Sequence, residues 1–281
     1  MNILTFDIEE WFHLLDFDAT RTEDKWGSYE VRIHENMERI FNILDETDTK
    51  ATFFIIGWIA KTYPEVVKKI AEKYEIGSHT MTHQLVWQQS PEEFKQDVDS
   101  SIKLLQDITG KPVKYFRAPG YSIRESEAYA FDTLAELGIE IDCSVFPAAH
   151  AHGGMPQFPK AAPSIIEHNG IRIKELPVTL GKFMGKDMIY SGGGYFRLFP
   201  YTMIKHLTKQ QNYTMTYFHP SDFDPGQPDM KHLPLLRRWK NRVGLKGAFH
   251  KYEKYLSDFE FVDLEQADKI IDWSAHSIVK L

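Results

Sequence analysis

The sequence is poor in cysteine, because Cys143 is the only one among 281 residues. A disulfide framework within the chain is therefore excluded, and Cys143 is expected to be a small core residue. No stretch approaches about 18 uncharged apolar residues, so we expect no membrane span. The first residues, from Met1 to Asp7, lack the basic and apolar segments that a secretory signal needs. These absences predict a cytoplasmic protein.

Long basic runs are also missing, and the formal net charge is -7. Nucleic acid is therefore not an expected partner, because phosphate binding requires clustered cations. The one short basic cluster consists of Arg237, Arg238, Lys240 and Arg242, and its ordinary interpretation is a solvated helix face. Hydrophobic residues make up 42% of the chain and charged residues 26%, which argues for a globular protein and against disorder. The oligomeric state stays open.

Apolar strands and amphipathic helices alternate over the first half of the sequence. Short apolar runs predict strands at 2–6, 51–57, 76–77, 113–116 and 139–142. Helices are predicted between them, at 34–47, from Pro64 onward, from a capping box at Ser90 to about Gly110, and at 125–137. Such alternation is typical of parallel βα units, so the expected fold class is α/β.

The second half of the sequence is less regular. Residues 146–170 are rich in Pro, Gly, Ala and His, and they are expected to form a long loop. Later predictions are a helix at 200–210, a strand at 213–218 and a C-terminal strand–helix extension over about 255–281, with its strand at 259–263. Because neither an internal repeat nor a linker divides the chain, we expect one domain over residues 1–281.

Two histidines, His79 and His83, directly follow a predicted strand. On a helical turn, a spacing of four residues places both imidazoles on one face. The first strand also ends among acids, namely Asp7, Glu9 and Glu10. Two histidines and one carboxylate form a three-ligand set that leaves room for water and substrate on a divalent ion. Zn²⁺ is the expected ion, with other divalent ions as alternatives, since it makes hydroxide available near neutral pH.

Five motifs follow one another along the chain: TFDIEEWFH at 5–13, SHTMTH at 78–83, FRAPGYS at 116–122, IDCSVFP at 141–147 and YFHPSDFDP at 217–225. Their order resembles the polysaccharide deacetylase family, whose members carry the NodB homology domain and are similar to carbohydrate esterase family 4. The N-terminal acids and the segment GGGYFR at 192–197 resemble its exopolysaccharide-associated branch. The resemblance covers the chain from residue 3 to about 265.

This resemblance implies a distorted, incomplete (β/α) barrel in a single domain. It also implies an enzyme that removes an N-acetyl group from an amino sugar, in a precursor or unit of a surface or exported polysaccharide. By the same resemblance, His79 and His83 match the metal-binding histidines. Asp7 matches the acid that serves as base, and Arg117 matches the arginine that orients this base.

The later motifs imply further roles by the same resemblance. His219 matches the histidine that protonates the leaving amine, and Asp142 falls in the motif whose acid tunes that histidine. The backbone N–H of Gly120 lies where the family has an oxyanion donor, although many relatives carry an aromatic residue at this position. Three aromatic residues near the motifs are candidates for stacking on sugar: Trp11, Trp87 and Tyr121.

The first motif departs from the common family form, which has two adjacent acids, the second a metal ligand. Here Ile8 occupies that second place. Because side chains alternate along a strand, Asp7 and Glu9 point to one side while Ile8 points to the other. We therefore expect Glu9 to bind the metal and Asp7 to act as base. If the chain turns after Ile8, Glu10 is the alternative ligand, and Asp7 itself is a third.

Two other functions stay open at this point. The chain could be a metal-dependent amidase or deformylase acting on a small non-sugar amide, or a catalytically degenerate carbohydrate-binding module. Long aromatic-rich loops favour a sugar over a small amide. The joint presence of five residues argues against a degenerate site: Asp7, His79, His83, Arg117 and His219.

Overall fold

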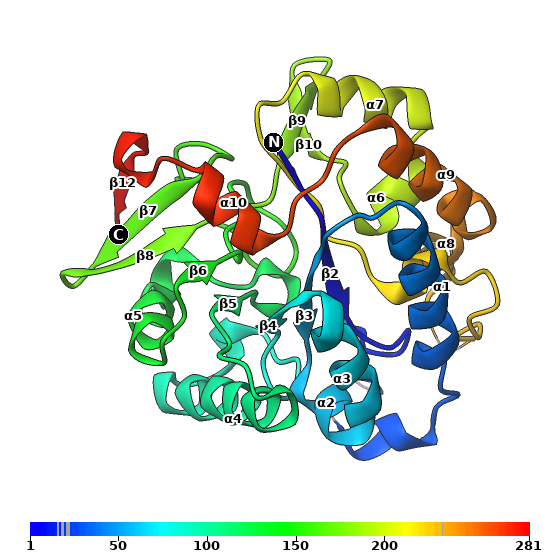
Figure 1. Cartoon of the computed structure of the whole chain (residues 1–281), viewed down its shortest axis with the longest axis horizontal. Coiled ribbons are helices and arrows are strands. Elements are labelled where there is room, and N and C mark those ends of the chain that lie inside the picture. The colour runs from blue at the N-terminus through cyan, green and yellow to red at the C-terminus, as the bar shows by residue number, and fades with distance from the viewer. Residues whose placement is uncertain (16, 18–19, 21–22, 232) are drawn as a thin grey trace. The chain divides into compact units, whose positions relative to one another are not determined.

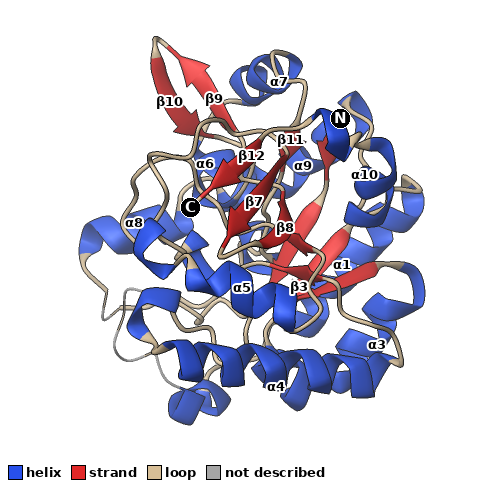
Figure 2. Ribbon diagram, turned by 90° about the vertical axis from the view of Figure 1, so that its left-hand side faces the viewer, coloured by secondary structure: helices blue, strands red, loops and turns tan. Residues whose placement is uncertain are grey.

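The computed structural model describes residues 1–15, 17, 20, 23–231 and 233–281. The chain forms two compact units, each built from two separate stretches of sequence. The first unit comprises residues Met1–Ala51 and Thr179–Val262, and the second comprises Thr52–Val178 and Asp263–Leu281. Figures 1 and 2 show the strands and helices of both units. The expectation of a single domain over 1–281 stays a prediction.

Short parallel strands form the centre of the first unit. Strand β1 (Asn2–Ile3) pairs with β11 (Thr214–Met215), and isolated bridges join Phe6 to Phe218 and Ile3 to Val262. The other elements of this unit are β2 (Thr5–Ile8), η1 (Glu23–Ser28), α1 (Ile33–Glu46), β9 (Leu180–Phe183), β10 (Lys186–Ile189), α6 (Gly193–Leu198), α7 (Tyr201–Lys209), η5 (Pro220–Phe223), α8 (Leu235–Arg242) and α9 (Leu245–Asp258). The strand predicted at 259–263 is thus reduced to the bridge at Val262.

Aromatic side chains fill the core of the first unit. Phe218 lies at its centre, with ring centroids 6.0 Å from Phe6, 4.9 Å from Phe196 and 5.3 Å from Tyr252. Phe223 packs on Tyr252 at 4.8 Å, and all five rings are buried. Large aromatic surfaces stabilise a core strongly. The high aromatic content of the chain is therefore used here for packing.

Gly192 allows the GGGYFR segment to lie directly against the strand that leads to His219. It forms a parallel bridge with Tyr217, and the N–H of Gly193 donates to the Tyr217 carbonyl at 3.1 Å. A Cβ atom on Gly192 would lie 2.0 Å from that carbonyl oxygen. Only glycine fits such a close approach of two backbones.

The second unit is a sheet with helices packed along it. Its strand order is β12–β7–β8–β6–β5–β4–β3, and every neighbouring pair is parallel except β7–β8. The strands are β3 (Thr52–Ile55), β4 (Glu75–Ser78), β5 (Tyr115–Phe116), β6 (Ile141–Asp142), β7 (Ser164–His168), β8 (Ile171–Glu175) and β12 (Ile278–Lys280). The helices are α2 (Gly57–Thr62), α3 (Pro64–Lys73), η2 (Val86–Gln88), α4 (Pro91–Thr109), η3 (Pro119–Tyr121), η4 (Glu125–Glu127), α5 (Tyr129–Glu136), α10 (Leu264–Ile270) and η6 (Trp273–Ala275).

The βα alternation predicted up to residue 142 is confirmed. At the start of α4, the Ser90 hydroxyl accepts from the Glu93 N–H, and the Glu93 carboxylate accepts from the Ser90 N–H. The helix ends at Gly110, whose φ is 66°. Both helix ends thus form where the capping signals place them.

The loop predicted at 146–170 extends too far, because β7 begins at Ser164. Strands β7 and β8 form an antiparallel hairpin, and its turn consists of Asn169 and Gly170 with φ of 50° and 81°. An Asn-Gly pair with positive φ at both residues is the strongest short-range signal for a tight hairpin. The sequence contained this signal, and the loop prediction overlooked it.

No helix in the described ranges is both long enough and apolar enough to cross a bilayer.

Replacing Gly192 by Ala is expected to lower the free energy of unfolding by about 3 kcal/mol or more, because the new Cβ would collide with backbone. Urea denaturation measures the change. Gly27→Ala is the matched control, since a Cβ there meets nothing within 4 Å. Equal stability of the two variants would show that the close approach at Gly192 does not constrain the fold.

Candidate active site

Two acids of the first motif lie on one side of the chain in the first unit. The carboxylate oxygens Oδ2 of Asp7 and Oε1 of Glu9 are 3.9 and 3.8 Å from Nε2 of His219. Asp7 and Glu9 are nearly buried, whereas the side chain of His219 is 26% exposed. Ile8, between the acids, is fully buried. The alternation predicted for residues 7–9 is therefore confirmed.

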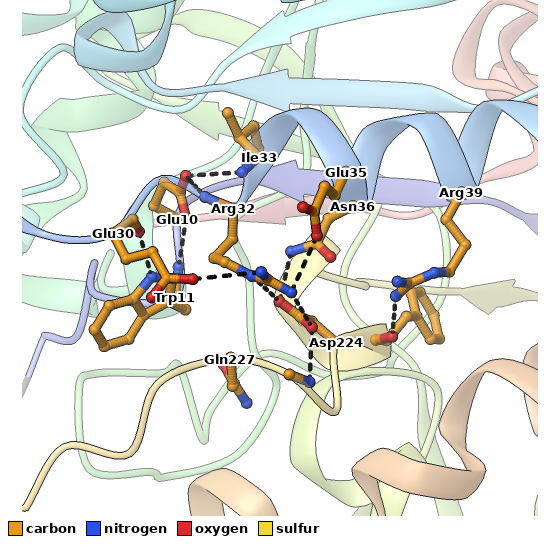
Figure 3. A network of polar contacts seen from close by, with 12 residues as sticks. Glu10, Trp11, Glu30, Arg32, Ile33, Glu35, Asn36, Arg39, Asp224 and Gln227 are labelled. Carbon is orange, nitrogen blue, oxygen red and sulfur yellow. Dashed lines mark hydrogen bonds and ion pairs between the residues drawn. The ribbon is translucent and has the colours of Figure 1, made fainter.

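Glu10 caps a helix instead of joining these acids (Figure 3). Its Oε1 accepts from the N–H groups of Arg32 at 2.7 Å and Ile33 at 2.8 Å, at the start of α1. Its Oε2 accepts from the N–H of Trp11 at 3.3 Å. Burial raises the pKa of Glu10 to about 7, although these backbone hydrogen bonds lower it. Both oxygens are engaged, which argues against Glu10 as the alternative metal ligand.

A second carboxylate in the same network fixes the chain after His219. Arg32 donates from Nε and Nη2 to the two oxygens of Asp224 at 2.9 and 3.0 Å, and Asn36 adds a bond at 3.2 Å. Bidentate pairs of this kind constrain direction as well as distance. Asp224 of the motif YFHPSDFDP is therefore a structural residue that ties this segment to α1.

His219 is held by an acid three residues later in the same motif. Oδ2 of Asp222 lies 3.0 Å from Nδ1 of His219 and accepts the backbone N–H of His219 at 2.9 Å. Burial alone would lower the pKa of His219, but the carboxylates of Asp222, Glu9 and Asp7 outweigh it and raise the pKa to about 9. In the absence of a bound ion, the imidazole is therefore protonated at neutral pH and faces two carboxylates.

Arg197 of the GGGYFR segment contacts Asp222, the acid that holds His219. Its Nε lies 3.0 Å from Oδ1 of Asp222, the oxygen that does not bind His219. Its Nη1 donates to the carbonyls of Asn241 and Val243 at the end of α8. The GGGYFR segment thus positions His219 through both Gly192 and Arg197. The roles of Asp222 and Arg197 were missed from the sequence, although both lie within motifs that were recognised.

Asp142, expected to tune His219, has different hydrogen-bond partners. Its buried carboxylate accepts from the Ser144 hydroxyl at 2.6 Å and the Ser144 N–H at 3.1 Å. It also shares a hydrogen bond with Glu175, whose pKa is raised well above its usual range by burial and by the charge of Asp142. Asp222, which binds Nδ1 of His219, is an acid that raises the pKa of this histidine and that the sequence did not single out. The tuning role of Asp142 stays a prediction.

In the second unit, His79 and His83 come together without a helix. They follow β4 in an irregular loop in which Thr80 and His83 have φ of 65° and 56°. Their ring centroids are 5.2 Å apart. The proximity predicted for the two imidazoles is confirmed, whereas the helical turn predicted to produce it was wrong. Left-handed backbone is rare for residues other than glycine and persists only where the surroundings enforce it.

Hydrogen bonds from two other elements hold this loop in place. Asp97 on α4 accepts from the N–H groups of Met81 and Thr82 at 2.6 and 3.2 Å, and from the Thr82 hydroxyl at 2.6 Å. In addition, the N–H of Gly57 at the start of α2 donates to the carbonyl of Thr80 at 2.9 Å. These partners satisfy backbone groups that a helix would have paired internally, which explains why no helix forms.

The tautomer of His79 is the one that a metal ligand requires. Nδ1 of His79 lies 2.7 Å from the backbone carbonyl oxygen of Arg117, which can only accept. Nδ1 therefore carries the proton, and Nε2 keeps its lone pair. Arg117 is itself fully buried, with its guanidinium 4.2 Å from the ring centroid of Phe54 and 5.7 Å from that of Tyr121.

The remaining predicted site residues have partners within their own units. Gly120 and Tyr121 lie in η3 with φ of 58° and 51°, and Tyr121 is buried. The indole N–H of Trp87 donates to a loop carbonyl at His152, and that of Trp11 donates to the carbonyl of Glu30. Trp11 also lines a small pocket. The oxyanion role of Gly120 and the sugar contacts of the three aromatic residues stay predictions.

The donor atoms fit a divalent ion. In the first unit, one ligand atom from each of Asp7, Glu9 and His219 lies within 4.8 Å of the others. In the second, His79 and His83 supply imidazole nitrogens, and the tautomer of His79 leaves Nε2 able to bind. Carboxylate oxygen and imidazole nitrogen together are typical ligands of Zn²⁺ and of related transition metals.

Comparison with known proteins places the chain in a family. Residues 4–141 match the family described as "Polysaccharide deacetylase", and residues 143–269 match a domain of unknown function, DUF3473. A peptidoglycan-N-acetylglucosamine deacetylase of Bacillus cereus is 31% identical over 90 residues, 32% of this chain and 33% of that protein. A chitooligosaccharide deacetylase of Azorhizobium caulinodans is 37% identical over 82 residues, 28% of this chain and 39% of that protein. The chain thus spans about a third of the length of these relatives.

A crystal structure of a protein described as a polysaccharide deacetylase from Mycobacterium smegmatis has the same fold. Its TM-score is 0.65 at 17% identity, and the match covers 100% of this chain and 92% of that one. The chain is therefore an α/β protein with the distorted, incomplete barrel fold of the NodB-homology type. It belongs to the polysaccharide deacetylase family through residues 4–141.

Replacing Asp97 by Ala is expected to weaken Zn²⁺ binding about 10- to 100-fold, because it removes three hydrogen bonds that hold the histidine loop. Competition with a chelating dye measures the affinity. Asp99→Ala on the same helix is the control, since Asp99 pairs with Lys103 of that helix. Equal affinities of the two variants would exclude this role for Asp97.

Replacing Asp222 by Asn is expected to lower the pKa of His219 from about 9 toward its ordinary value of 6.5 in the metal-free protein. NMR titration of the imidazole measures this change. Because the native pKa is raised, protonation of His219 stabilises the fold fully below pH 6.5, and this contribution disappears as the pH rises through 9.

The stability difference between the wild type and D222N should therefore be largest below pH 6.5. Asp229→Asn, which removes an acid paired with Arg238, is the control and should leave the His219 titration unchanged. An unchanged pKa in D222N would contradict the assignment of Asp222 as the tuning acid.

Proposed function

We propose that this chain is a metal-dependent hydrolase that removes the N-acetyl group from an amino sugar. The observation that carries the proposal is that Nε2 of His219 lies 3.9 and 3.8 Å from the carboxylates of Asp7 and Glu9 within one unit. Although burial lowers the pKa of His219, Asp222 and these two acids raise it to about 9, which favours the protonated form. A proton donor beside a proton acceptor is the arrangement that amide hydrolysis requires. The family match supports the same reaction class.

Glu9, His79 and His83 are the proposed metal ligands, with Zn²⁺ as the first candidate. The tautomer of His79 and the engagement of Glu10 elsewhere support this choice. When bound, the ion would supply a water of lowered pKa and polarise the acetamide carbonyl. Because Glu9 is the proposed carboxylate ligand, Asp7 remains available as the base that takes the proton from the water.

The protein residues manage the protons of the reaction. Asp7 accepts a proton from the water that adds to the acetamide carbon, and Arg117 orients this carboxylate. His219, held protonated by Asp222, donates its proton to the nitrogen as the C–N bond breaks, which releases acetate and a free amine. The N–H of Gly120 is the proposed backbone donor to the developing oxyanion.

The proposed substrate is an N-acetylglucosamine-containing oligosaccharide or a precursor of a surface polysaccharide. The printed names of the two relatives concern peptidoglycan N-acetylglucosamine and chitooligosaccharide, which supports a sugar over a small amide. Trp11, Trp87 and Tyr121 are the proposed stacking residues. A cytoplasmic location and a nucleotide- or lipid-linked precursor are part of the same proposal.

The Zn²⁺-loaded protein is expected to release acetate from N-acetylglucosamine oligomers. Asp7→Asn should reduce the rate at least about 100-fold, since it removes the base while leaving the shape of the side chain. Asp229→Asn is the matched control. Enzymatic measurement of acetate checks both variants against the wild type.

Three results would contradict the proposal. Undiminished activity of D7N would exclude Asp7 as base. Turnover of small cyclic amides or formamides without turnover of acetylated sugars would identify the alternative hydrolase. Binding of the oligomers without acetate release at any divalent ion would identify a carbohydrate-binding module.

A further inference from the structure

Helix α8 exposes three large apolar side chains, while two of its three arginines are partly covered. Leu235, Leu236 and Trp239 are 79%, 66% and 52% exposed, and none of the residues of α8 is buried. Arg237 and Arg238 are only partly exposed. A helix on the surface of a soluble unit normally has the reverse arrangement, because burial of apolar area is favourable. Lys240 and Arg242 of the basic cluster are exposed, as expected for a solvated face, but Leu235, Leu236 and Trp239 are exposed on the same helix.

Polar contacts within the first unit fix this orientation. Arg238 forms a bidentate pair with Asp229, and Nη1 of Arg242 donates to the carbonyl of Gln227 at 2.9 Å. The carbonyls at the end of α8 accept from Arg197, which also contacts Asp222. These polar contacts hold α8 in an orientation in which Leu235, Leu236 and Trp239 are exposed.

The segment around α8 is also cationic, in a chain whose formal net charge is -7. No Asp or Glu occurs from Met230 to Tyr252. Lysine and arginine side chains in this segment reach solvent beside the apolar face: Lys231, Lys240, Arg242 and Lys246. Exposed leucine and tryptophan flanked by cations are the composition of helices that lie in the interface of an anionic bilayer.

Other occupants fit this face less well. A sugar polymer could stack on Trp239 but would gain little from Leu235 and Leu236, because aliphatic side chains do not offer a ring face. A second copy bound across a two-fold axis would bring Lys240 and Lys246 toward the same cations of its partner, since such an interface is self-complementary. Charge complementarity therefore favours a lipid surface.

We propose that α8 docks this chain on a membrane surface that contains anionic lipid. Leu235, Leu236 and Trp239 enter the boundary between headgroups and acyl chains, and the flanking cations face lipid phosphates. A single short helix gives reversible attachment rather than insertion. Arg197 connects the end of α8 with Asp222, which holds His219, so the docking helix and the proposed proton donor share one support. Docking on lipid goes beyond the proposed function, and vesicle binding tests it independently of catalysis.

The test is cosedimentation of the full chain with vesicles. Vesicles of phosphatidylcholine mixed with phosphatidylglycerol should bind the chain, and vesicles of phosphatidylcholine alone should bind it weakly. Combined substitution of Leu235, Leu236 and Trp239 by Ser should reduce binding at least about 10-fold, because it removes the apolar anchor. Lys240→Glu with Lys246→Glu should reduce binding to the anionic vesicles and weaken its salt dependence.

Ile270→Ser is the matched control, since Ile270 is 63% exposed on α10. It should bind vesicles as the wild type does. Because α8 buries no residue, the triple variant should keep the fold, and its acetate release from soluble oligomers should be unchanged. Failure of docking is thereby distinguished from failure of the proposed activity.

Two results would overturn the proposal. One concerns the vesicles: the chain does not bind anionic vesicles more than its triple variant does. The other is self-association without lipid that the triple variant loses, which would assign the face to a second copy of the chain.

Discussion

The position of His219 in the first unit depends on one ion pair, that with Asp222. Oδ2 of Asp222 binds both the ring and the backbone of His219, while Oδ1 contacts Arg197. One carboxylate thus fixes the position of the histidine, keeps it protonated and links it to the end of α8 through an arginine. A buried acid with cations on both oxygens is stable because neither oxygen is left without a partner. The GGGYFR segment and the motif YFHPSDFDP therefore act as one structural element.

In the second unit, hydrogen bonds to backbone groups hold the histidine loop in place. This loop contains two left-handed residues, and Asp97 and Gly57 hold it through hydrogen bonds to its backbone. The carbonyl of Arg117 then selects the tautomer of His79. In both units, the side chains that would do chemistry are oriented by residues that would not touch the substrate. Such supporting contacts are what distinguish a positioned ligand from a histidine on a surface.

The sequence predicted much of the fold, because the signals involved are local. The βα alternation, the capping box at Ser90 and the alternation of Asp7, Ile8 and Glu9 depend on spacing and residue type alone. The helical turn at His79 was wrong because helix spacing says nothing about Asp97, which lies more than one element away. The contact of Asp222 with Nδ1 of His219 was missed because a motif position cannot show which oxygen reaches the ring, and the role of Asp142 stays a prediction. Glu10 stayed open as an alternative to Glu9, because the sequence does not show that its carboxylate accepts from N–H groups at the start of α1.

The sequence by itself determined the family resemblance, the α/β class and the residue types of the site, because motif order and periodicity are properties of the chain. Only the tertiary structure decided that Asp222 tunes His219, that Glu10 caps α1 and that α8 presents leucine and tryptophan to solvent. Asp222 and His219 are only three residues apart and meet through the turn between them. Capping by Glu10 depends on a contact between segments distant in sequence, and the exposure of leucine and tryptophan depends on the direction in which α8 faces. Local propensity carries no information about either, since the same side chain is favourable or costly according to what surrounds it.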